Sequence, residues 1–181
     1  MTSSINKIIM LLILVATLHS CNQGPTLQTY YVDNELLPGF TSLDVPTSFL
    51  NIDEAGLTDE QKEAYNSIDK LNMLGFVIGE DNKAEYKVEL AKIKTILKAP
   101  KYQELMRGGN ATDGKFVIKF IGEEDSIDEL ILFGNAANRG FVIVRVLGDD
   151  MNVNKIMKLS SVLQNLDLDN SQLNQFTDFF K

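Results

Sequence analysis

The first feature of the chain is an apolar run from Ile8 to Leu18, which follows a polar start with one positive charge. A charged start, an apolar run and a small residue, here Ser20, form the layout of a secretory signal. The run is shorter than the roughly 20 residues with which a helix crosses a bilayer. The pattern therefore predicts that residues 1–20 are a cleaved signal, and it disfavours a transmembrane helix or a buried N-terminal core helix.

After this segment, residues 21–38 predict a tether with one or two helical turns around Leu27 to Leu36. Residues 39–181 then predict a single domain, because no second composition regime or repeat interrupts them. Alternating positions predict a short strand from Phe40 to Val45, and Pro46 suits the first position of a short helix.

Helix and strand patterns alternate over the next part of the chain. Two capping-box patterns, each a polar residue followed three positions later by Glu or Gln, mark predicted helix starts. The predicted elements are a helix from Asp59 to Lys70 after the box Thr58/Gln61, a buried strand from Leu71 to Ile78, a helix from Lys83 to Lys98 after the box Asn82/Glu85, and a helical stretch from Tyr102 to Arg107 ended by Gly108 and Gly109. Val88, Ala91 and Ile96 are the predicted inward side of the longest helix. Strand, helix and strand in one sheet predict a right-handed parallel crossover.

Three apolar runs separated by short, turn-rich gaps dominate the second half of the chain. They are Lys115 to Ile121, Ile127 to Gly134 and Phe141 to Leu147. Such gaps favour antiparallel hairpins, and a pairing of Ile121 with Ile127 would set Lys119 opposite Glu129. A helix from Val153 to Asn165 follows. Together the elements predict a two-layer α+β fold, with a mixed sheet of about five strands, an antiparallel meander in the C-terminal half, and helices mainly on one face.

The meander strands are apolar on both faces. Phe116, Ile118 and Phe120 share one face, and Val117 and Ile121 on the other face are apolar as well. An antiparallel sheet with one wet face is polar there, so the second face is predicted to be covered. The predicted interaction or lid surface comprises Val117, Ile121, Ile131, Phe133, Phe176, Phe179 and Phe180. Its cover is either the chain's own terminal segments, with the last three phenylalanines as the lid, or an envelope protein partner or a second copy of the chain.

Composition excludes several kinds of chemistry. The chain has one histidine and one cysteine, His19 and Cys21, at the end of the export segment. A domain without imidazole or free thiol has no Ser-His-Asp triad, cysteine nucleophile or histidine base, and lacks the usual zinc ligands. We therefore predict no cofactor and no metal site, whereas chemistry based on carboxylates, lysine or tyrosine is not excluded. The formal net charge of −8 disfavours nucleic acid as a partner.

The stretch Leu18-His19-Ser20-Cys21 resembles a lipobox, which consists of an aliphatic residue, two small residues and an invariant cysteine. His19 departs from the motif, and an ordinary signal peptidase site, the alternative, requires a small residue where Leu18 stands. The resemblance implies a lipid on Cys21, with cleavage before it. At about 0.8 kcal/mol per buried methylene, two or three acyl chains hold a protein firmly on a membrane. The residues after Cys21 are not acidic, unlike those of surface-exported lipoproteins, which favours the periplasmic side of the outer membrane.

Several stretches of the chain are similar to one protein family. They are TYYVDNE, PGFTSLDVPTSFL, YQELMRGG, GKFVIKF and GDDMNVNKIMKL. On these stretches the chain resembles a family of Bacteroidota lipoproteins known as domain of unknown function 4252, over nearly the whole mature chain. The resemblance implies an envelope location and an α+β fold, and it implies no catalytic residue.

These observations predict a membrane-anchored envelope lipoprotein whose domain is a non-catalytic module that binds an envelope protein or a small apolar ligand. One alternative is a carboxylate-dependent periplasmic enzyme, for example one that acts on glycans, and another is a structural or envelope-stress lipoprotein. An enzyme would present two facing carboxylates or a perturbed acid in a concave site. A binding module would instead present an apolar patch or groove.

Overall fold

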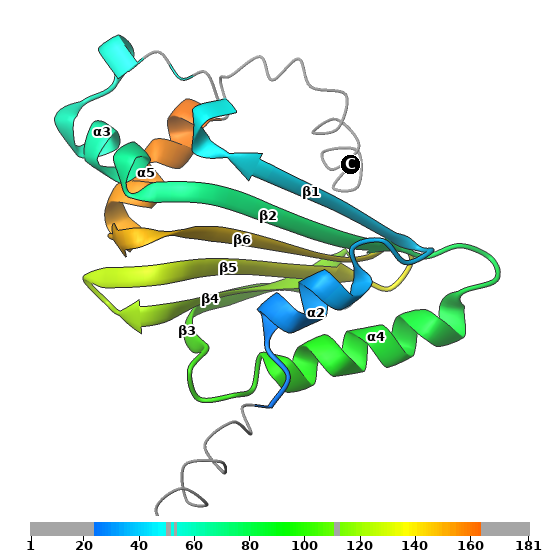
Figure 1. Cartoon of the computed structure of the whole chain (residues 1–181). Coiled ribbons are helices and arrows are strands. Elements are labelled where there is room, and N and C mark those ends of the chain that lie inside the picture. The colour runs from blue at the N-terminus through cyan, green and yellow to red at the C-terminus, as the bar shows by residue number, and fades with distance from the viewer. Residues whose placement is uncertain (1–23, 50–51, 53, 111–112, 164–181) are drawn as a thin grey trace, which may run out of the picture.

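The computed structural model describes residues 24–163 except residues 50, 51, 53, 111 and 112. This part of the chain forms one six-stranded sheet in the order β1-β2-β6-β5-β4-β3, with helices on both faces (Figure 1). The strands are β1 (Phe40–Pro46), β2 (Ile68–Val77), β3 (Gln103–Asn110), β4 (Gly114–Glu123), β5 (Ser126–Ala136) and β6 (Gly140–Met151). The helices are α2 (Leu27–Asn34), α3 (Asp59–Asn66), α4 (Lys83–Ile96) and α5 (Val153–Leu163), with 3-10 turns η1 (Thr47–Phe49) and η2 (Glu54–Gly56).

The predicted α+β class and the antiparallel meander of β4, β5 and β6 are confirmed. The parallel crossover is wrong, and every strand pairing in the described part of the sheet is antiparallel. β1 and β2 are neighbours, with Leu43 opposite Met73, but the connection that contains η1, η2 and α3 stays at one end of the sheet. A connection that does not travel the length of the sheet returns the chain in the opposite direction.

The predicted helix from Tyr102 to Arg107 is also wrong, because this stretch belongs to the edge strand β3, which pairs with β4. Most side chains of β3 are exposed, so the strand lacks the alternation of buried and exposed positions that identifies a strand in a sequence. Two glycines of β3 stand at positions where a side chain would clash or where the backbone has a positive φ. A Cβ on Gly108 would lie 2.6 Å from the ring of Phe116, and Gly109 adopts a φ of +91° beside the hairpin to β4.

The two predicted capping boxes have different outcomes. The first is confirmed, since the Gln61 backbone N–H donates to the Thr58 hydroxyl and the Thr58 N–H donates to the Gln61 side chain. α3 nevertheless ends at Asn66, because the chain enters β2 at Ile68. The second box does not form. The side chain of Asn82 accepts from the Gly79 N–H and donates to the Val77 carbonyl, and so it closes the loop after β2 instead of capping α4.

Of the three residues of α4 predicted to face inward, only Ile96 is buried. The buried residues of this helix are Tyr86, Glu89, Ile93 and Ile96. Val88, a predicted inward residue, is 55 % exposed, and Ala91 is exposed as well. The apolar pattern gave the wrong side because the buried stripe includes a carboxylate. Glu89 accepts a hydrogen bond of 2.8 Å from the Tyr30 hydroxyl and pairs with Lys92 at 2.7 Å, and these two partners satisfy its carboxylate.

The register between β4 and β5 differs by one position from the one predicted at their connection. Gly122, not Ile121, lies opposite Ile127, and an irregularity follows that sets Ile121 opposite Glu129. Lys119 therefore lies opposite Ile131, and the predicted pair of Lys119 with Glu129 does not form. One extra residue in a strand changes which side chains face each other across the ladder, and sequence spacing alone does not reveal it.

The sheet carries a hydrophobic cluster on each face. On one face α2 and α4 cover Leu74, Phe76, Ile131, Phe133 and Phe141, among others. On the other face α3 and α5 pack together over residues that include Leu130 and Val146. Leu27, in the segment predicted as a tether, is only 1 % exposed, so α2 contributes to the core of the domain.

The face of α3 and α5 is only partly covered by the described residues. Met106, Phe116 and Leu132, all on that face, are 45 %, 43 % and 38 % exposed. The predicted lid residues Phe176, Phe179 and Phe180 lie outside the described residues, as does Cys21. None of the helices in the described ranges is long and apolar enough to span a membrane.

Candidate functional site

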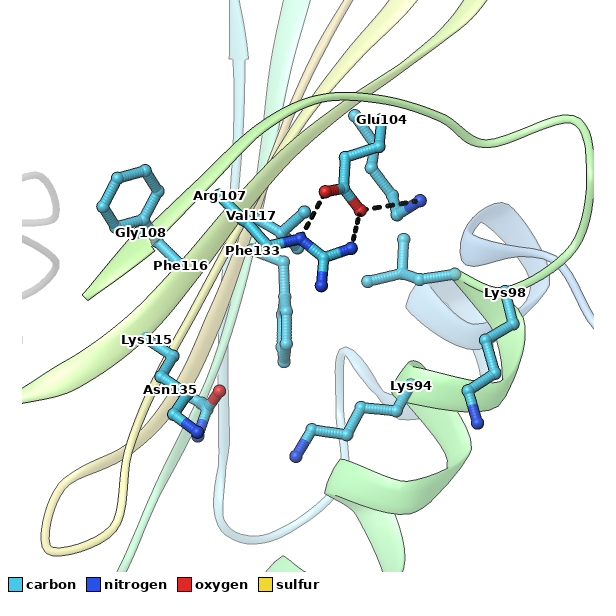
Figure 2. A pocket seen from close by; sticks show the side chains of 12 residues that line it. Lys94, Lys98, Glu104, Arg107, Gly108, Lys115, Phe116, Val117, Phe133 and Asn135 are labelled. Carbon is cyan, nitrogen blue, oxygen red and sulfur yellow. Dashed lines mark hydrogen bonds and ion pairs between the residues drawn. The ribbon is translucent and has the colours of Figure 1, made fainter. Parts of the chain in front are cut away.

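A groove of about 430 Å³ lies between the C-terminal half of α4 and the edge of the sheet formed by β3, β4 and β5 (Figure 2). This volume falls within the range of about 300–1,000 Å³ that is usual for small-molecule sites. The groove is lined by Lys94, Leu97, Lys98, Glu104, Arg107, Gly108, Lys115, Phe116, Val117, Lys119, Phe133 and Asn135. We call it the edge groove.

The floor of the edge groove is apolar. Arg107, Val117 and Phe133 lie opposite one another across β3, β4 and β5, so they share one face of the sheet. The ring of Phe133 points from the sheet toward α4, where Leu97 is buried in the same cluster. Val117 is partly buried, and Phe133 is 4 % exposed. The last turn of α4 therefore covers Phe133 and leaves Val117 only partly covered at this edge.

Five cationic side chains surround this floor. Lys94 lies in the last turn of α4, and Lys98 lies in the turn that follows the end of this helix. Lys115, Val117 and Lys119 occupy every second position of β4, so their side chains lie on the same face of the sheet. Arg107 completes the set from the edge strand β3. Tertiary packing thus gathers cations from three elements.

The one carboxylate of the groove, Glu104, is already paired. Arg107 donates to it from Nε and Nη2, and the Lys119 Nζ lies 3.8 Å from its Oε2. The hydrogen bond from Arg107, followed by the charges of Arg107 and Lys119, lowers the pKa of Glu104 below its usual value. Glu104 is therefore ionised at neutral pH and holds the Arg107 guanidinium in a fixed orientation at the rim.

The remaining cations are not neutralised by the protein. Within the described ranges, neither Lys94, Lys98 nor Lys115 has a carboxylate at ion-pair distance. Five cations against one carboxylate leave an excess of four positive charges in the groove. The chain as a whole has a formal net charge of −8. A concave site of the opposite sign concentrates the local field and attracts anions.

A second groove, between α2 and α4, is larger, at about 950 Å³. Its lining includes Asp33, Lys87 and Lys92, and Lys92 pairs with Glu89 at 2.7 Å. Its charged groups thus largely compensate one another, and it offers no excess charge of one sign. The edge groove is the better candidate, because its unpaired cations and open apolar floor together specify a chemical class of ligand.

The residues of the predicted interaction surface lie in different environments in the structure. Val117 and Phe133 line the edge groove, whereas Ile131 is fully buried and Ile121 is partly buried in the cluster under α2 and α4. The second sheet face is covered as the sequence predicts, but α4 and the N-terminal helix α2 supply the cover in the described part of the chain.

Sequence reasoning missed all five cations of the groove. The spacing of Lys94 with Lys98 was a usable signal; the assignment of Arg107 to a helix concealed the rest.

Nothing in the edge groove resembles an acid and base pair. Glycoside hydrolysis and related reactions need two carboxyl groups that flank the substrate, and Glu104 is the single carboxylate in the lining. Its lowered pKa also makes it a poor proton donor. Among the described residues, no group of three or more His, Cys, Asp and Glu side chains has the arrangement of a metal site.

Comparison with known sequences identifies the family of this domain. The sequence profile of a family described as a domain of unknown function (DUF4252) matches residues 34–159. The chain belongs to the DUF4252 family. No curated protein and no solved structure matches the chain at a significant level. The match spans β1 to β6 and every residue that lines the edge groove, so the groove is part of the DUF4252 domain itself.

Proposed function

We propose that this DUF4252 protein is an envelope lipoprotein, attached through a lipid on Cys21 and facing the periplasm, whose domain is a non-catalytic binding module. The edge groove is the place where the module binds its ligand. The observation that carries the proposal is the groove at this edge of the sheet, whose apolar lining includes the partly exposed Val117 and the 43 % exposed Phe116. Apolar surface in a concave, partly enclosed site is the usual setting for a bound small molecule.

The position of α2 supports a location close to the membrane. Since Leu27 begins a helix that packs into the core, the segment between Cys21 and the folded domain is much shorter than the tether predicted for residues 21–38. Six residues span at most about 20 Å when fully extended. A lipid on Cys21 would therefore hold the domain, and the edge groove with it, within a short distance of the bilayer surface.

The lining of the groove favours binding over catalysis. A carboxylate enzyme, the competing function, needs a second acidic side chain near Glu104, and the groove offers cations there instead. Lys94, Lys98 and Lys115 are exposed at the rim and are not buried in an apolar setting of the kind that activates a lysine nucleophile. What the lining supports is attraction and retention of a ligand.

The attachment is tested by labelling with a fatty acid in a bacterial host that processes lipoproteins. We expect the wild-type chain to take up label and to fractionate with membranes, and Cys21→Ser to do neither. The variant Lys83→Gln, an exposed change far from the signal, serves as a matched control and should behave as wild type. Label that persists on Cys21→Ser would contradict attachment at this residue.

The binding role is tested by extracting the purified protein with organic solvent and identifying co-purified small molecules by mass spectrometry. Val117→Trp fills the groove with a larger side chain, and Val77→Trp places the same residue at a 49 % exposed position that does not line the groove. We expect one class of molecule to be recovered from wild type and Val77→Trp and to be lost from Val117→Trp. Identical extracts from all three proteins would contradict binding in the groove.

A further inference from the structure

The edge groove has two chemically different parts, and together they define a ligand. Building on the proposed function, we infer that the groove binds a single anionic amphiphile, a molecule with one phosphate or carboxylate head group and an apolar tail. The tail would lie on the floor at Val117, above the buried Leu97 and Phe133, and the head group would lie among the cations of the rim. The larger groove between α2 and α4 lacks this combination, because its charged groups largely compensate one another.

The rim is equipped to recognise an oxyanion. Arg107 has five N–H donors, and Glu104 engages its Nε and Nη2. The donors that remain, on Nη1 and the outer side of Nη2, are held in a fixed plane by this pairing, and a planar guanidinium fork suits carboxylate and phosphate oxygens. Arg107 is 75 % exposed, so a ligand can reach it without opening the fold.

Lysines from opposite sides of the groove complete the rim. Figure 2 shows Lys94 reaching from α4 toward Asn135 and Lys115 on the sheet, while Lys98 stands at the other end of the helix segment. Lys119 is less available, since it is 14 % exposed and its Nζ donates to the Tyr102 carbonyl at 2.9 Å. Like charges that converge without counter-charges repel one another, and a bound anion relieves this repulsion.

The floor explains why the ligand is an amphiphile and not a simple ion. Inorganic phosphate would contact only the rim and would leave the exposed surface of Val117 and Phe116 in water. Each methylene of a tail that is removed from water strengthens binding. A neutral amphiphile would contact the apolar floor but would bring no negative charge to the cations of the rim. Only a molecule with both parts uses the whole lining.

The inference is tested with three probes on the Cys21→Ser chain: dodecyl phosphate, dodecyl maltoside with the same tail and no charge, and inorganic phosphate with no tail. Binding is measured by calorimetry at concentrations at which the detergents are monomeric. We expect dodecyl phosphate to bind with one site per chain, and each of the other probes to bind at least about tenfold more weakly. Binding of dodecyl phosphate should also weaken as the salt concentration rises.

Two matched double variants locate the head group. Lys94→Gln with Lys98→Gln removes two rim charges, and Lys83→Gln with Lys87→Gln removes the same charge from exposed positions of α4 outside the edge groove. We expect the first pair to weaken binding of dodecyl phosphate on the order of five- to tenfold and the second to change it little. Equal effects would mean that general charge attraction, not the groove, holds the anion, and would overturn the inference.

The outcomes separate this inference from the proposed function. If dodecyl maltoside binds as tightly as dodecyl phosphate, the groove binds apolar molecules without an anionic head group, and only the inference fails. If no tailed probe binds, the binding module itself is contradicted. Sedimentation of the protein with vesicles of zwitterionic lipid, with and without anionic lipid, tests whether the ligand comes from a bilayer. Sedimentation with the anionic vesicles alone would indicate a bilayer lipid, and no sedimentation alongside tight binding of dodecyl phosphate would indicate a free amphiphile.

Discussion

Arg145 on β6 and Glu129 on β5 form an ion pair inside the domain, with 2.6 Å between Nε and Oε1 and 3.2 Å between Nη2 and Oε2. The two residues are 3 % and 8 % exposed. A further donor of Arg145, Nη1, contacts the side-chain oxygen of Gln28 on α2 at 2.8 Å. The pair thus links the central strands to the helix that covers them, and we expect α2 to unfold together with the sheet as one unit.

Removal of one partner of this pair should destabilise the domain strongly. Arg145→Met leaves the Glu129 carboxylate buried without a counter-charge, and we expect it to lower the free energy of unfolding by about 3–5 kcal/mol. The double variant Glu129→Leu with Arg145→Met buries no lone charge, so it should cost less than Arg145→Met alone. Urea denaturation monitored by circular dichroism measures all three proteins. A double variant that is the least stable of them would contradict the prediction.

The same unit can be tested through α2 alone. Leu27→Ala removes a side chain that is 1 % exposed, and we expect a loss of about 2–5 kcal/mol in the free energy of unfolding. Val32→Ala on the same helix changes a residue that is 56 % exposed and should stay within about 0.5 kcal/mol of wild type. Equal, small effects of both substitutions in urea denaturation would mean that α2 is a detachable tether.

Much of the sheet could be predicted from the sequence because its pattern is local. The strands from β4 to β6 are long and apolar and are separated by short turns, and the box of Thr58 and Gln61 marks the start of α3. These signals depend on residues within a few positions of one another. The fold class and the order of elements in the C-terminal half follow from them.

Several of the errors depend on a contact that is distant in the sequence. β3 is a strand because β4 supplies its hydrogen bonds, and its own side chains carry no alternation. Glu89 faces the core because Tyr30, far away in the chain, donates to it. The groove needs Arg107 on β3 beside Lys94 on α4, and no spacing along the chain brings these two residues together.

The tyrosines of α2 predict a specific loss of stability in alkali. Burial, followed by the charges of Asp44 and Glu35, raises the pKa of Tyr31 from 10.0 to about 12. The folded state therefore keeps the phenolic proton at pH values where the unfolded chain releases it. This contribution to stability is fully present below pH 10 and is lost as the pH rises through 12. Burial also raises the pKa of Tyr30, which acts in the same direction.

The measurement compares urea denaturation of wild type and Tyr31→Phe between pH 8 and the alkaline range. We expect the free energy of unfolding of wild type to fall more steeply above pH 10 than that of Tyr31→Phe, because phenylalanine has no proton to lose. The two values at pH 8 serve as the reference for each protein. Curves that remain parallel through the alkaline range would show that Tyr31 is not protected by the fold.

The central claim is that the edge groove binds the ligand, and methyl NMR of the Cys21→Ser chain titrated with dodecyl phosphate tests it most directly. The account predicts saturable shifts at the methyl groups of Leu97 and Val117, which line the groove. The methyl groups of Met106 and Leu132, exposed on the opposite face of the sheet, should remain unchanged. Shifts centred on Met106 and Leu132, with Leu97 and Val117 unmoved, would contradict it.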